Sequence, residues 1–198
     1  CGSCWAFSTT GSTEGRYEIA KGQLISLSEQ QLVDCGAAEG SHGCEGGLMD
    51  FGFQYIIDNG GLCTEQAYPY EARDDSCRAG SCTPAVKISS FQDVAQMNED
   101  ALKTAVADGP VSVAIEADQS CFQFYSGGVM TDSGCGTQLD HGVLVVGYGT
   151  DNGQDYWKVK NSWGASWGEA GYIRLGRGSG SGKAGECGIA SQPSYPVV

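Results

Sequence analysis

The stretch Cys-Gly-Ser-Cys-Trp-Ala-Phe at positions 1–7 decides how the rest of this sequence is interpreted. Ser3 can act as an N-cap and Gly22 as a stop signal, so we predict a helix from Ser3 to about Ala20. Cys4 then lies in the first helical turn, where the helix dipole and the unsatisfied N–H groups favour a thiolate. The pattern therefore predicts a reactive sulfur at a helix N-terminus.

The Cys1-x-x-Cys4 spacing also has two other interpretations, a thioredoxin-like redox pair and half of a zinc site. A redox pair of this type stands near a βαβ pattern, and a zinc site needs a second pair of ligands at similar spacing. The sequence that follows has neither feature. We therefore rank both interpretations below a nucleophilic thiol and expect no metal and no organic cofactor.

Composition narrows the class of protein. The 198 residues carry a net charge of −13, which argues against binding to nucleic acid or to an anionic membrane. No apolar run approaches the roughly 18 residues that span a bilayer. Ten cysteines indicate an oxidising route such as secretion, vacuole or lysosome. There is no signal peptide and the sequence begins inside a motif, so it is either a mature form cut from a precursor or a fragment that lacks its beginning, and we favour the fragment.

The first half reads as helical and the second as β-rich. Residues 28–31 resemble a capping box that opens a short helix ending near Cys35, and residues 48–58 form a further apolar helix. A loop-rich connection covers 61–90. We place a domain boundary at residue 92, which gives a helical domain over 1–92 and a β-rich domain over 93–198.

The second half begins with a helix over 98–108, capped by Asn98 and ended by Gly109-Pro110. We predict strands after this helix, because segments rich in β-branched and aromatic residues are separated by glycines. This pattern indicates an antiparallel sheet or barrel. We predict a mobile surface loop over 176–185. The predicted strands cover residues 111–116, 122–125, 142–148, 156–160 and 171–175.

The candidate partners of Cys4 lie in this second half. His141 stands 137 residues after Cys4, and Asn161 stands 20 residues further on. With this order and spacing, the sequence resembles the papain family of cysteine proteases, in particular its cathepsin L-like and plant vacuolar members. The resemblance covers the whole chain. It rests on the first motif and on Ser28-Glu-Gln-Gln-Leu-Val-Asp-Cys35, Gly43-Cys-Glu-Gly-Gly-Leu-Met49, Tyr68-Pro-Tyr70, Asp140-His-Gly142 and Asn161-Ser-Trp-Gly164.

The resemblance implies an α+β, papain-like two-domain fold, with a helical domain, an antiparallel β-barrel domain and the active site between them. It implies that Cys4 is the nucleophile and that His141 is the base. Asn161 would orient the imidazole through its side-chain oxygen, and Trp163 would cover that hydrogen bond. Trp167 would pack against the Asn161 region.

The resemblance also implies an oxyanion hole made by the Cys4 backbone N–H and a Gln side chain a few residues before Cys1. This Gln would precede the sequence as printed. Losing one such donor typically costs about 10²–10³ in rate. We therefore expect the printed sequence to be incomplete as an enzyme, and inactivity of this fragment for lack of that Gln stays an open alternative.

For substrate binding, Gly46 and Gly47 resemble a bare backbone edge that pairs with an extended peptide. The pocket for the second residue before the cut is mostly apolar by resemblance, so we predict a preference for Leu, Phe or Val there. Asp140 would be a wall residue, not a third catalytic member, and His42 a surface histidine. The pocket residues are Leu48, Met49, Ala114, Leu139 and Gln192.

The resemblance implies the disulfides Cys1–Cys44, Cys35–Cys77 and Cys135–Cys187. A fourth bond, Cys63–Cys82, is then plausible and leaves Cys121 as a thiol. This agrees with the number of cysteines. If one of the ten is a catalytic thiol, nine remain, and an odd number of cysteines cannot all pair within the chain.

These observations together predict a monomeric cysteine endopeptidase of the lysosome or vacuole, or a secreted one. It would act on proteins and peptides, with cystatin-like inhibitors and an N-terminal propeptide as partners by resemblance. We prefer an endopeptidase because no insertion resembles an occluding loop. The alternative is a non-catalytic papain-fold binding or storage protein. Such homologues usually lose the nucleophile or the base, whereas this sequence keeps Cys4 and His141.

Overall fold

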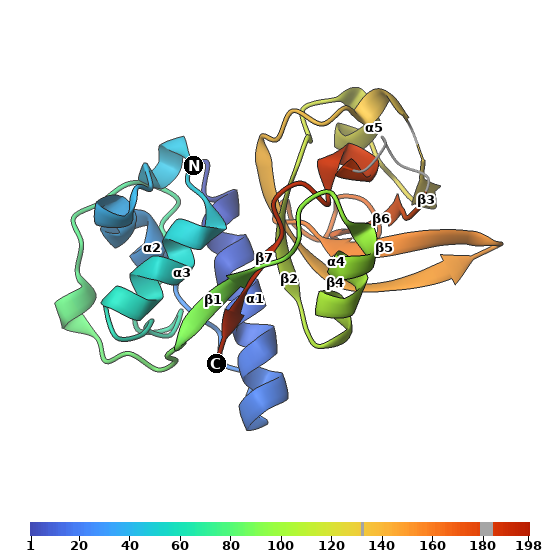
Figure 1. The fold of residues 1–198 in the computed structure, drawn as a ribbon. Helices are drawn as coiled ribbons and strands as arrows, with labels where there is room; N and C mark the ends of the chain where they lie inside the picture. Colours follow the sequence, from blue (N-terminus) through green and yellow to red (C-terminus); the bar gives the residue numbers. More distant parts are fainter. Residues whose placement is uncertain (132, 179–183) are drawn as a thin grey trace. The chain divides into compact units, whose positions relative to one another are not determined.

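The computed structural model describes residues 1–131, 133–178 and 184–198, which form two compact units (Figure 1). Unit 1 contains Cys1–Gln92 and Ser194–Val198, and unit 2 contains Asp93–Pro193. The expected domain over 93–198 is therefore wrong for its last five residues. These residues form a strand held in unit 1, where the Ser194 hydroxyl is hydrogen-bonded to Asp50 and the Arg16 guanidinium stacks on Tyr195.

Unit 1 is built on three helices, α1 (Cys4–Lys21), α2 (Glu29–Cys35) and α3 (Met49–Asp58) (Figure 1). The buried face of α1 is mostly polar, which is unusual for a core helix. Its threonines compensate for burial by internal hydrogen bonds. The Thr9 hydroxyl donates to the Trp5 carbonyl, and the Thr13 hydroxyl donates to the Thr9 carbonyl. Such a helix can be buried without an apolar stripe.

Two helix termini of unit 1 follow the sequence signals, whereas the expected Ser3 cap of α1 is not formed. Gly22 ends α1 in the left-handed conformation, and the Ser28 hydroxyl caps α2 by accepting from the Gln31 backbone N–H. The capping box is only half formed, because the Gln31 side chain does not reach back to Ser28. It accepts from the Cys63 N–H and donates to the Tyr55 hydroxyl. Gln31 therefore joins α2 to the loop-rich segment.

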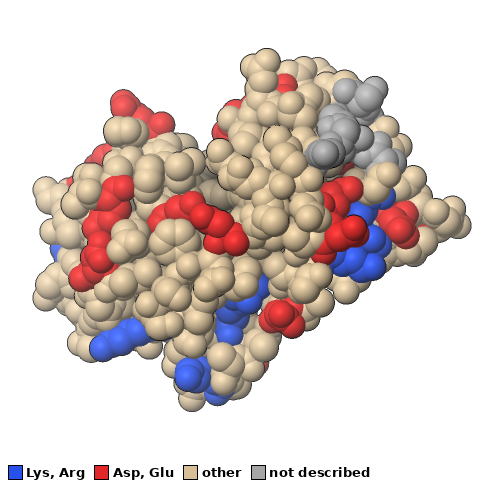
Figure 2. Space-filling view, viewed as in Figure 1, with Lys and Arg blue, Asp and Glu red and all other residues tan. Residues whose placement is uncertain are grey.

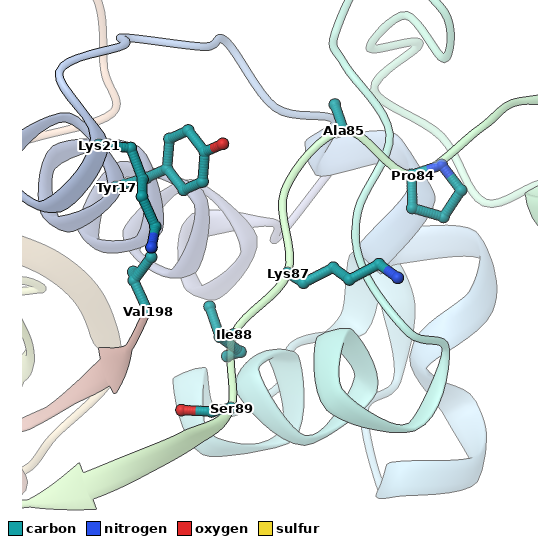
Figure 3. Close-up of a pocket in the computed structure, with 8 residues that line it drawn as sticks. All are labelled: Tyr17, Lys21, Pro84, Ala85, Lys87, Ile88, Ser89 and Val198. Atoms are coloured by element: carbon teal, nitrogen blue, oxygen red, sulfur yellow. The ribbon is translucent and has the colours of Figure 1, made fainter.

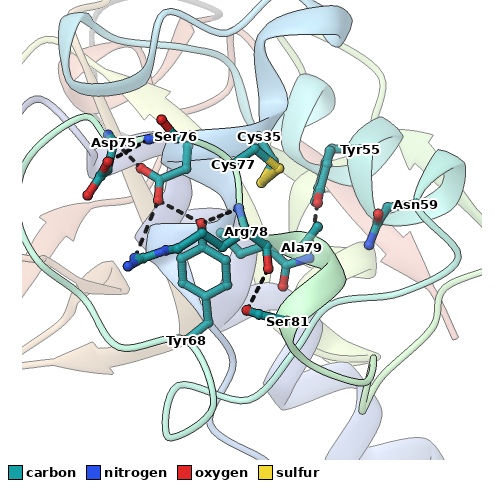
Figure 4. Close-up of a disulfide and its surroundings, with 12 residues drawn as sticks. Cys35, Tyr55, Asn59, Tyr68, Asp75, Ser76, Cys77, Arg78, Ala79 and Ser81 are labelled. Atoms are coloured by element: carbon teal, nitrogen blue, oxygen red, sulfur yellow. Dashed lines mark hydrogen bonds and ion pairs between the residues drawn. A yellow bond between two sulfur atoms is a disulfide. The ribbon is translucent and has the colours of Figure 1, made fainter.

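The loop-rich segment 61–90 is held by disulfides and buried polar contacts instead of regular structure. Figure 4 shows the Cys35–Cys77 bond beside Tyr68 and Arg78. The Tyr68 hydroxyl donates to the buried Asp34 carboxylate and accepts from the Arg78 backbone N–H. Such groups can be buried because each has a partner.

Unit 1 ends in two short strands, β1 (Ser90–Asp93) and β7 (Ser194–Val197), which neighbour each other. Beside them lies a pocket of about 470 Å³ (Figure 3). Tyr17 and Lys21, in the last turns of α1, line it together with Lys87 and Ile88. Because Cys4 is the first residue of α1, this pocket lies at the opposite end of the helix from the candidate nucleophile.

Unit 2 contains a sheet with the strand order β2-β4-β5-β6-β3. The pairs are antiparallel except β3–β6, which is parallel. The expected barrel is not formed: among the described residues β3 pairs only with β6, and it is too short, at two residues, to close the sheet. The strands are β2 (Val111–Ile115), β3 (Val129–Met130), β4 (His141–Asp151), β5 (Gln154–Lys160) and β6 (Tyr172–Gly176).

Among its described residues, unit 2 also contains two α-helices. Helix α4 (Glu99–Ala107) is capped by Asn98, whose side chain accepts from Ala101 N–H, as the sequence predicted. Helix α5 (Ser120–Gln123) replaces the strand expected over 122–125. The apolar residues there are too few to separate a strand from one helical turn. The 3₁₀ helices that the structure describes are η1 (Gly36–Glu39), η2 (Gly43–Glu45), η3 (Ala79–Ser81), η4 (Ser133–Cys135) and η6 (Glu186–Gly188).

Residues 179–183 of the predicted mobile loop over 176–185 lie outside the described residues. In the described part of the chain, no helix is both long and apolar enough to cross a membrane. Acidic atoms are more widespread than basic ones on the face shown in Figure 2, in keeping with the net charge of −13.

Four disulfides are present among the described residues. The three in unit 1 are pairs expected from the resemblance and from the remaining cysteines: Cys1–Cys44, Cys35–Cys77 and Cys63–Cys82. In unit 2, however, Cys135 is bonded to Cys121, with 6.2 Å between their Cα atoms. The expected Cys135–Cys187 bond is therefore replaced. The Cys187 sulfur nevertheless lies within 4.8 Å of the Cys135 sulfur, which can hold only one partner.

Candidate active site

In unit 1 the candidate nucleophile is fixed at the start of a helix. Cys4 is the first residue of α1 and is partly buried. The Ser3 carbonyl accepts from the N–H groups of Ala6 and Phe7, which starts the helix at this point. The Ser3 hydroxyl does not cap the helix but forms a hydrogen bond with the Tyr70 hydroxyl. The first turn contains no acidic side chain, so nothing there opposes a thiolate.

The segment before Cys4 is held against the loop around Cys44. Cys1 is disulfide-bonded to Cys44, and the Gly2 N–H donates to the Cys44 carbonyl at 2.7 Å. A Cβ atom on Gly2 would lie 2.6 Å from that carbonyl oxygen, so only glycine fits. The indole N–H of Trp5 donates to the Gly43 carbonyl from the other side. The motif residues therefore bind one loop through three separate contacts.

The predicted substrate edge lies on this loop. Gly46 has a φ of 118°, a conformation that favours glycine, and its surroundings are open. A Cβ on Gly47 would lie 2.8 Å from the Trp5 ring, so its backbone lies directly on the indole. Within the described residues, neither backbone polar group of Gly47 is hydrogen-bonded. Leu48 is exposed and Met49 is buried at the start of α3.

In unit 2, His141 and Asn161 form a hydrogen-bonded pair. His141 begins β4 and Asn161 directly follows β5, and both side chains are buried. His141 Nε2 lies 2.7 Å from Asn161 Oδ1. The same oxygen accepts from the Ser162 backbone N–H at 2.8 Å, which fixes it as an acceptor. His141 must therefore carry a proton on Nε2, and the pair determines the orientation of the ring.

Aromatic rings surround this pair. The Trp163 ring lies 5.0 Å from the His141 ring, measured between centroids. The fully buried Phe122 ring lies edge-on to both, at 5.4 Å from Trp163 and 6.3 Å from His141. Trp167 packs on Phe122 at 5.1 Å and donates its indole N–H to the Gln123 carbonyl. The sequence analysis missed Phe122, because it assigned this residue to a strand.

A comparison with models of known protein families identifies the family of this chain. The model of the papain family of cysteine proteases matches residues 1–197. This chain belongs to that papain family. Among curated relatives it is 54% identical over 198 residues to cysteine proteinase RD21A of Arabidopsis thaliana and 55% identical over 201 residues to cathepsin L of Sarcophaga peregrina. Both alignments cover all of this chain but 42% and 58% of those proteins.

Solved papain-family structures agree with the fold. The bromelain protease of Ananas comosus, solved with an inhibitor, matches with a TM-score of 0.94 at 43% identity, covering all of this chain and 90% of that one. The Amb a 11 cysteine protease of ragweed pollen, solved in its proform, matches with a TM-score of 0.95 at 45% identity, covering all of this chain and 60% of that one. The chain thus spans about half the length of the curated papain-family relatives named above.

The remaining predicted papain-type pocket residues occupy defined places in unit 2. Ala114 lies in β2 opposite Gly142 and is buried, whereas Gln192 is exposed. Leu139 packs against Gly188. Asp140 does not point to a catalytic role here: its carboxylate accepts from the Ala117 backbone N–H and its own N–H donates to Ile115.

Proposed function

We propose that this chain is the catalytic part of a cysteine endopeptidase that cuts peptide bonds through Cys4, His141 and Asn161. The observation that carries the proposal is the Nε2–Oδ1 hydrogen bond, which leaves Nδ1 as the nitrogen for exchanging a proton with the Cys4 sulfur. The helix N-terminus at Cys4 supports the second requirement, a thiolate nucleophile.

In the proposed reaction, the Cys4 thiolate attacks the scissile carbonyl carbon and forms a tetrahedral intermediate. The negative oxygen is stabilised by the Cys4 backbone N–H, which points out of the first helical turn. The imidazolium of His141 then gives its proton to the leaving amine, and an acyl-enzyme remains. Water attacks this thioester with His141 as the base, the acyl group leaves as a carboxylic acid, and the thiolate and the imidazolium are restored. Asn161 keeps the ring oriented through both steps.

For substrate binding we propose that the backbone of Gly47 pairs with an extended peptide. Its polar groups are available and its flat position on Trp5 leaves no side chain in the way. The pocket for the second residue before the cut would be formed by Leu48, Met49, Ala114, Leu139 and Gln192. Because four of these five are apolar, we expect a preference for Leu, Phe or Val at that position.

We further propose that the protein is synthesised with an N-terminal propeptide and acts in a lysosome, a vacuole or outside the cell. Two observations support this: a relative of similar fold, Amb a 11, was solved in its proform, and the four disulfides fit an oxidising route. Cystatin-like inhibitors would be its partners and it would act as a monomer.

Labelling with an epoxysuccinyl peptide inhibitor at pH 5, followed by peptide mass spectrometry, tests the catalytic assignment. We expect one adduct on Cys4 and turnover of a peptide substrate, both of which disappear in Cys4→Ala. His141→Ala should lose turnover while it remains folded by circular dichroism. A folded protein that gives neither adduct nor turnover would favour the non-catalytic binding alternative.

A peptide library varied at the second residue before the cut tests the pocket. The expected result is at least tenfold selection of Leu, Phe or Val over Asp, because one apolar group of this size is worth about 1–3 kcal/mol in a hydrophobic pocket. A dominant preference for acidic residues at pH 5 would contradict the pocket assignment.

A further inference from the structure

Glu116 directly follows β2 in unit 2, and its side chain is buried without a cationic partner. Only 6% of the residue is exposed, and no Lys, Arg or His of the described residues forms an ion pair with it. A buried carboxylate is costly unless hydrogen-bond donors compensate for the lost water. The Gln138 backbone N–H donates to Oε2, and the Gln119 side-chain amide donates to Oε1 at 3.0 Å. Glu116 therefore connects the end of β2 to the segment that precedes His141.

The backbone at Gly136 is shaped to receive this carboxylate. Gly136 has a φ of 67°, a conformation that favours glycine. A Cβ atom at this position would overlap the Glu116 carboxylate, at 2.7 Å from Oε1. The carboxylate therefore occupies the space that a side chain at position 136 would need. Because Gly136 and Gln138 both contact it, the carboxylate fixes the course of the chain on both sides of residue 137.

His141 is held by a different set of contacts. The Asp140 N–H donates to the Ile115 carbonyl at 2.9 Å, and the Asp140 carboxylate accepts from the Ala117 N–H at 2.8 Å. His141 itself lies opposite Ile115 in the β2–β4 pair. None of these contacts uses the Glu116 side chain. Loss of the Glu116 carboxylate should therefore leave His141 in place and loosen only the chain that comes before Asp140.

We propose that Glu116 is a positioning residue for the pocket that takes the second residue before the cut. This inference rests on the proposed function, in which Leu139 lines that pocket. Glu116 binds the backbone of Gln138, the residue directly before Leu139, and the Leu139 side chain packs against Gly188. The carboxylate thus determines where this wall of the pocket lies. It acts on the pocket and not on the reacting atoms, so it affects substrate selection and KM but not kcat.

Three variants separate the hydrogen bonds from the charge. Glu116→Ala removes both bonds. Glu116→Gln restores both, because its amide oxygen accepts from the Gln138 N–H and the Gln119 amide turns over to accept from its amide nitrogen. Gln119→Ala is the matched control, since it removes only the contact to Oε1. Glu116→Asp keeps the charge with a side chain one methylene shorter, and it replaces Glu116→Ala in both measurements if Glu116→Ala does not fold.

Hydrogen exchange measures the position of the segment without any need for activity. Each variant is made in a Cys4→Ala background, and amide exchange is followed by mass spectrometry. We expect exchange at Gln138 to be at least tenfold faster in Glu116→Ala than with Glu116 present, because its amide loses its acceptor. Exchange should be unchanged in Glu116→Gln and in Gln119→Ala.

Peptide substrates with Leu or Val at the second residue before the cut give the second readout, in proteins that keep Cys4. Glu116→Ala should raise KM for the Leu substrate several-fold and lower the Leu-to-Val ratio of kcat/KM at least threefold, with kcat within twofold of the wild type. Glu116→Gln and Gln119→Ala should match the wild type. A general loss of folded enzyme would lower the rates for both substrates equally, so their ratio isolates the effect on the pocket.

Two results overturn the proposal. One is unchanged exchange at Gln138 in the folded Glu116→Ala variant. The other is a Leu-to-Val ratio that stays at the wild-type value, whether or not kcat falls. If the wild type turns over neither substrate, the proposed function fails and the pocket role fails with it, while the exchange at Gln138 still decides whether Glu116 fixes this segment.

Discussion

Glu29 gives the sharpest test of the energetics of unit 1. It is the first residue of α2, only 9% of it is exposed, and its carboxylate accepts a hydrogen bond from the Thr10 hydroxyl of α1. Burial is the main cause that raises its pKa from the usual 4.5 to about 7, and the charges of Glu65 and Glu14 add to the rise. The hydrogen bond from Thr10 acts in the opposite direction but is outweighed.

The sign of the pH dependence follows from this shift. Between pH 4.5 and 7 the unfolded chain releases the Glu29 proton while the folded chain retains it, so the free energy of unfolding falls as pH rises. The stability is fully present below pH 4.5 and is lost as pH passes through 7. Because one pKa unit corresponds to 1.36 kcal/mol, the loss between pH 4 and pH 8 is about 3 kcal/mol.

Glu29→Gln should remove this dependence. An amide oxygen can still accept from Thr10, but the side chain no longer ionises. Urea unfolding followed by tryptophan fluorescence, with Cys4 blocked to prevent self-digestion, gives the free energy of unfolding at pH 4 and pH 8. We expect the wild type to lose about 3 kcal/mol more than Glu29→Gln between these two pH values.

Glu18→Gln is the matched control, because it removes the same charge from an exposed position on α1. It should keep the pH dependence of the wild type. If Glu29→Gln loses as much stability as the wild type between pH 4 and pH 8, the assignment of a buried, protonated carboxyl to Glu29 is wrong.

Three further changes test the site and the scaffold. Gly47→Ala places a Cβ 2.8 Å from the indole beneath it and should cost about 1–3 kcal/mol in urea unfolding, whereas Gly80→Ala, which faces open space, should cost far less. Asn161→Ala should lower kcat about 10- to 100-fold with the fold intact, since it removes a hydrogen bond worth about 1.5–3 kcal/mol; an unchanged kcat would refute its positioning role. Replacing both Cys63 and Cys82 with alanine opens a loop of 19 residues and should lower the free energy of unfolding by about 3 kcal/mol. An unchanged free energy of unfolding would show that this disulfide does not constrain the unfolded chain.

The helices of unit 1 could be predicted because their ends carry strong local signals. Ser28 caps α2, Asn98 caps α4 in unit 2 in the same way, and Gly22 ends α1. These signals depend on neighbours within a few residues. The strand expected at Phe122 was wrong because the structure there depends on contacts with residues that are distant in sequence. Four residues form one helical turn there, and the packing of Phe122 against distant tryptophans, not the local pattern, selects it.

In the candidate site and its surroundings, too, some features could be predicted from the sequence and others could not. His141 and Asn161 could be predicted from their order and spacing, and their hydrogen bond follows from adjacent strands, because β4 and β5 pair with Leu144 opposite Lys160. The disulfide of unit 2 could not be predicted. Cys121 and Cys135 are only 14 residues apart, whereas Cys187 comes much later in the sequence, and sequence separation does not say which two sulfurs of a cluster are bonded.

The buried polar side of α1 connects stability to the proposed chemistry. The helix that presents Cys4 packs through hydroxyl groups, and one of them, on Thr10, is bound to the carboxyl that changes charge near neutral pH. At acidic pH the Glu29 carboxyl is neutral and can be buried against α1 at little cost. At neutral pH the same contact buries a charge, which weakens the packing of α1 on α2. The helix that carries the proposed nucleophile is therefore held most firmly at acidic pH.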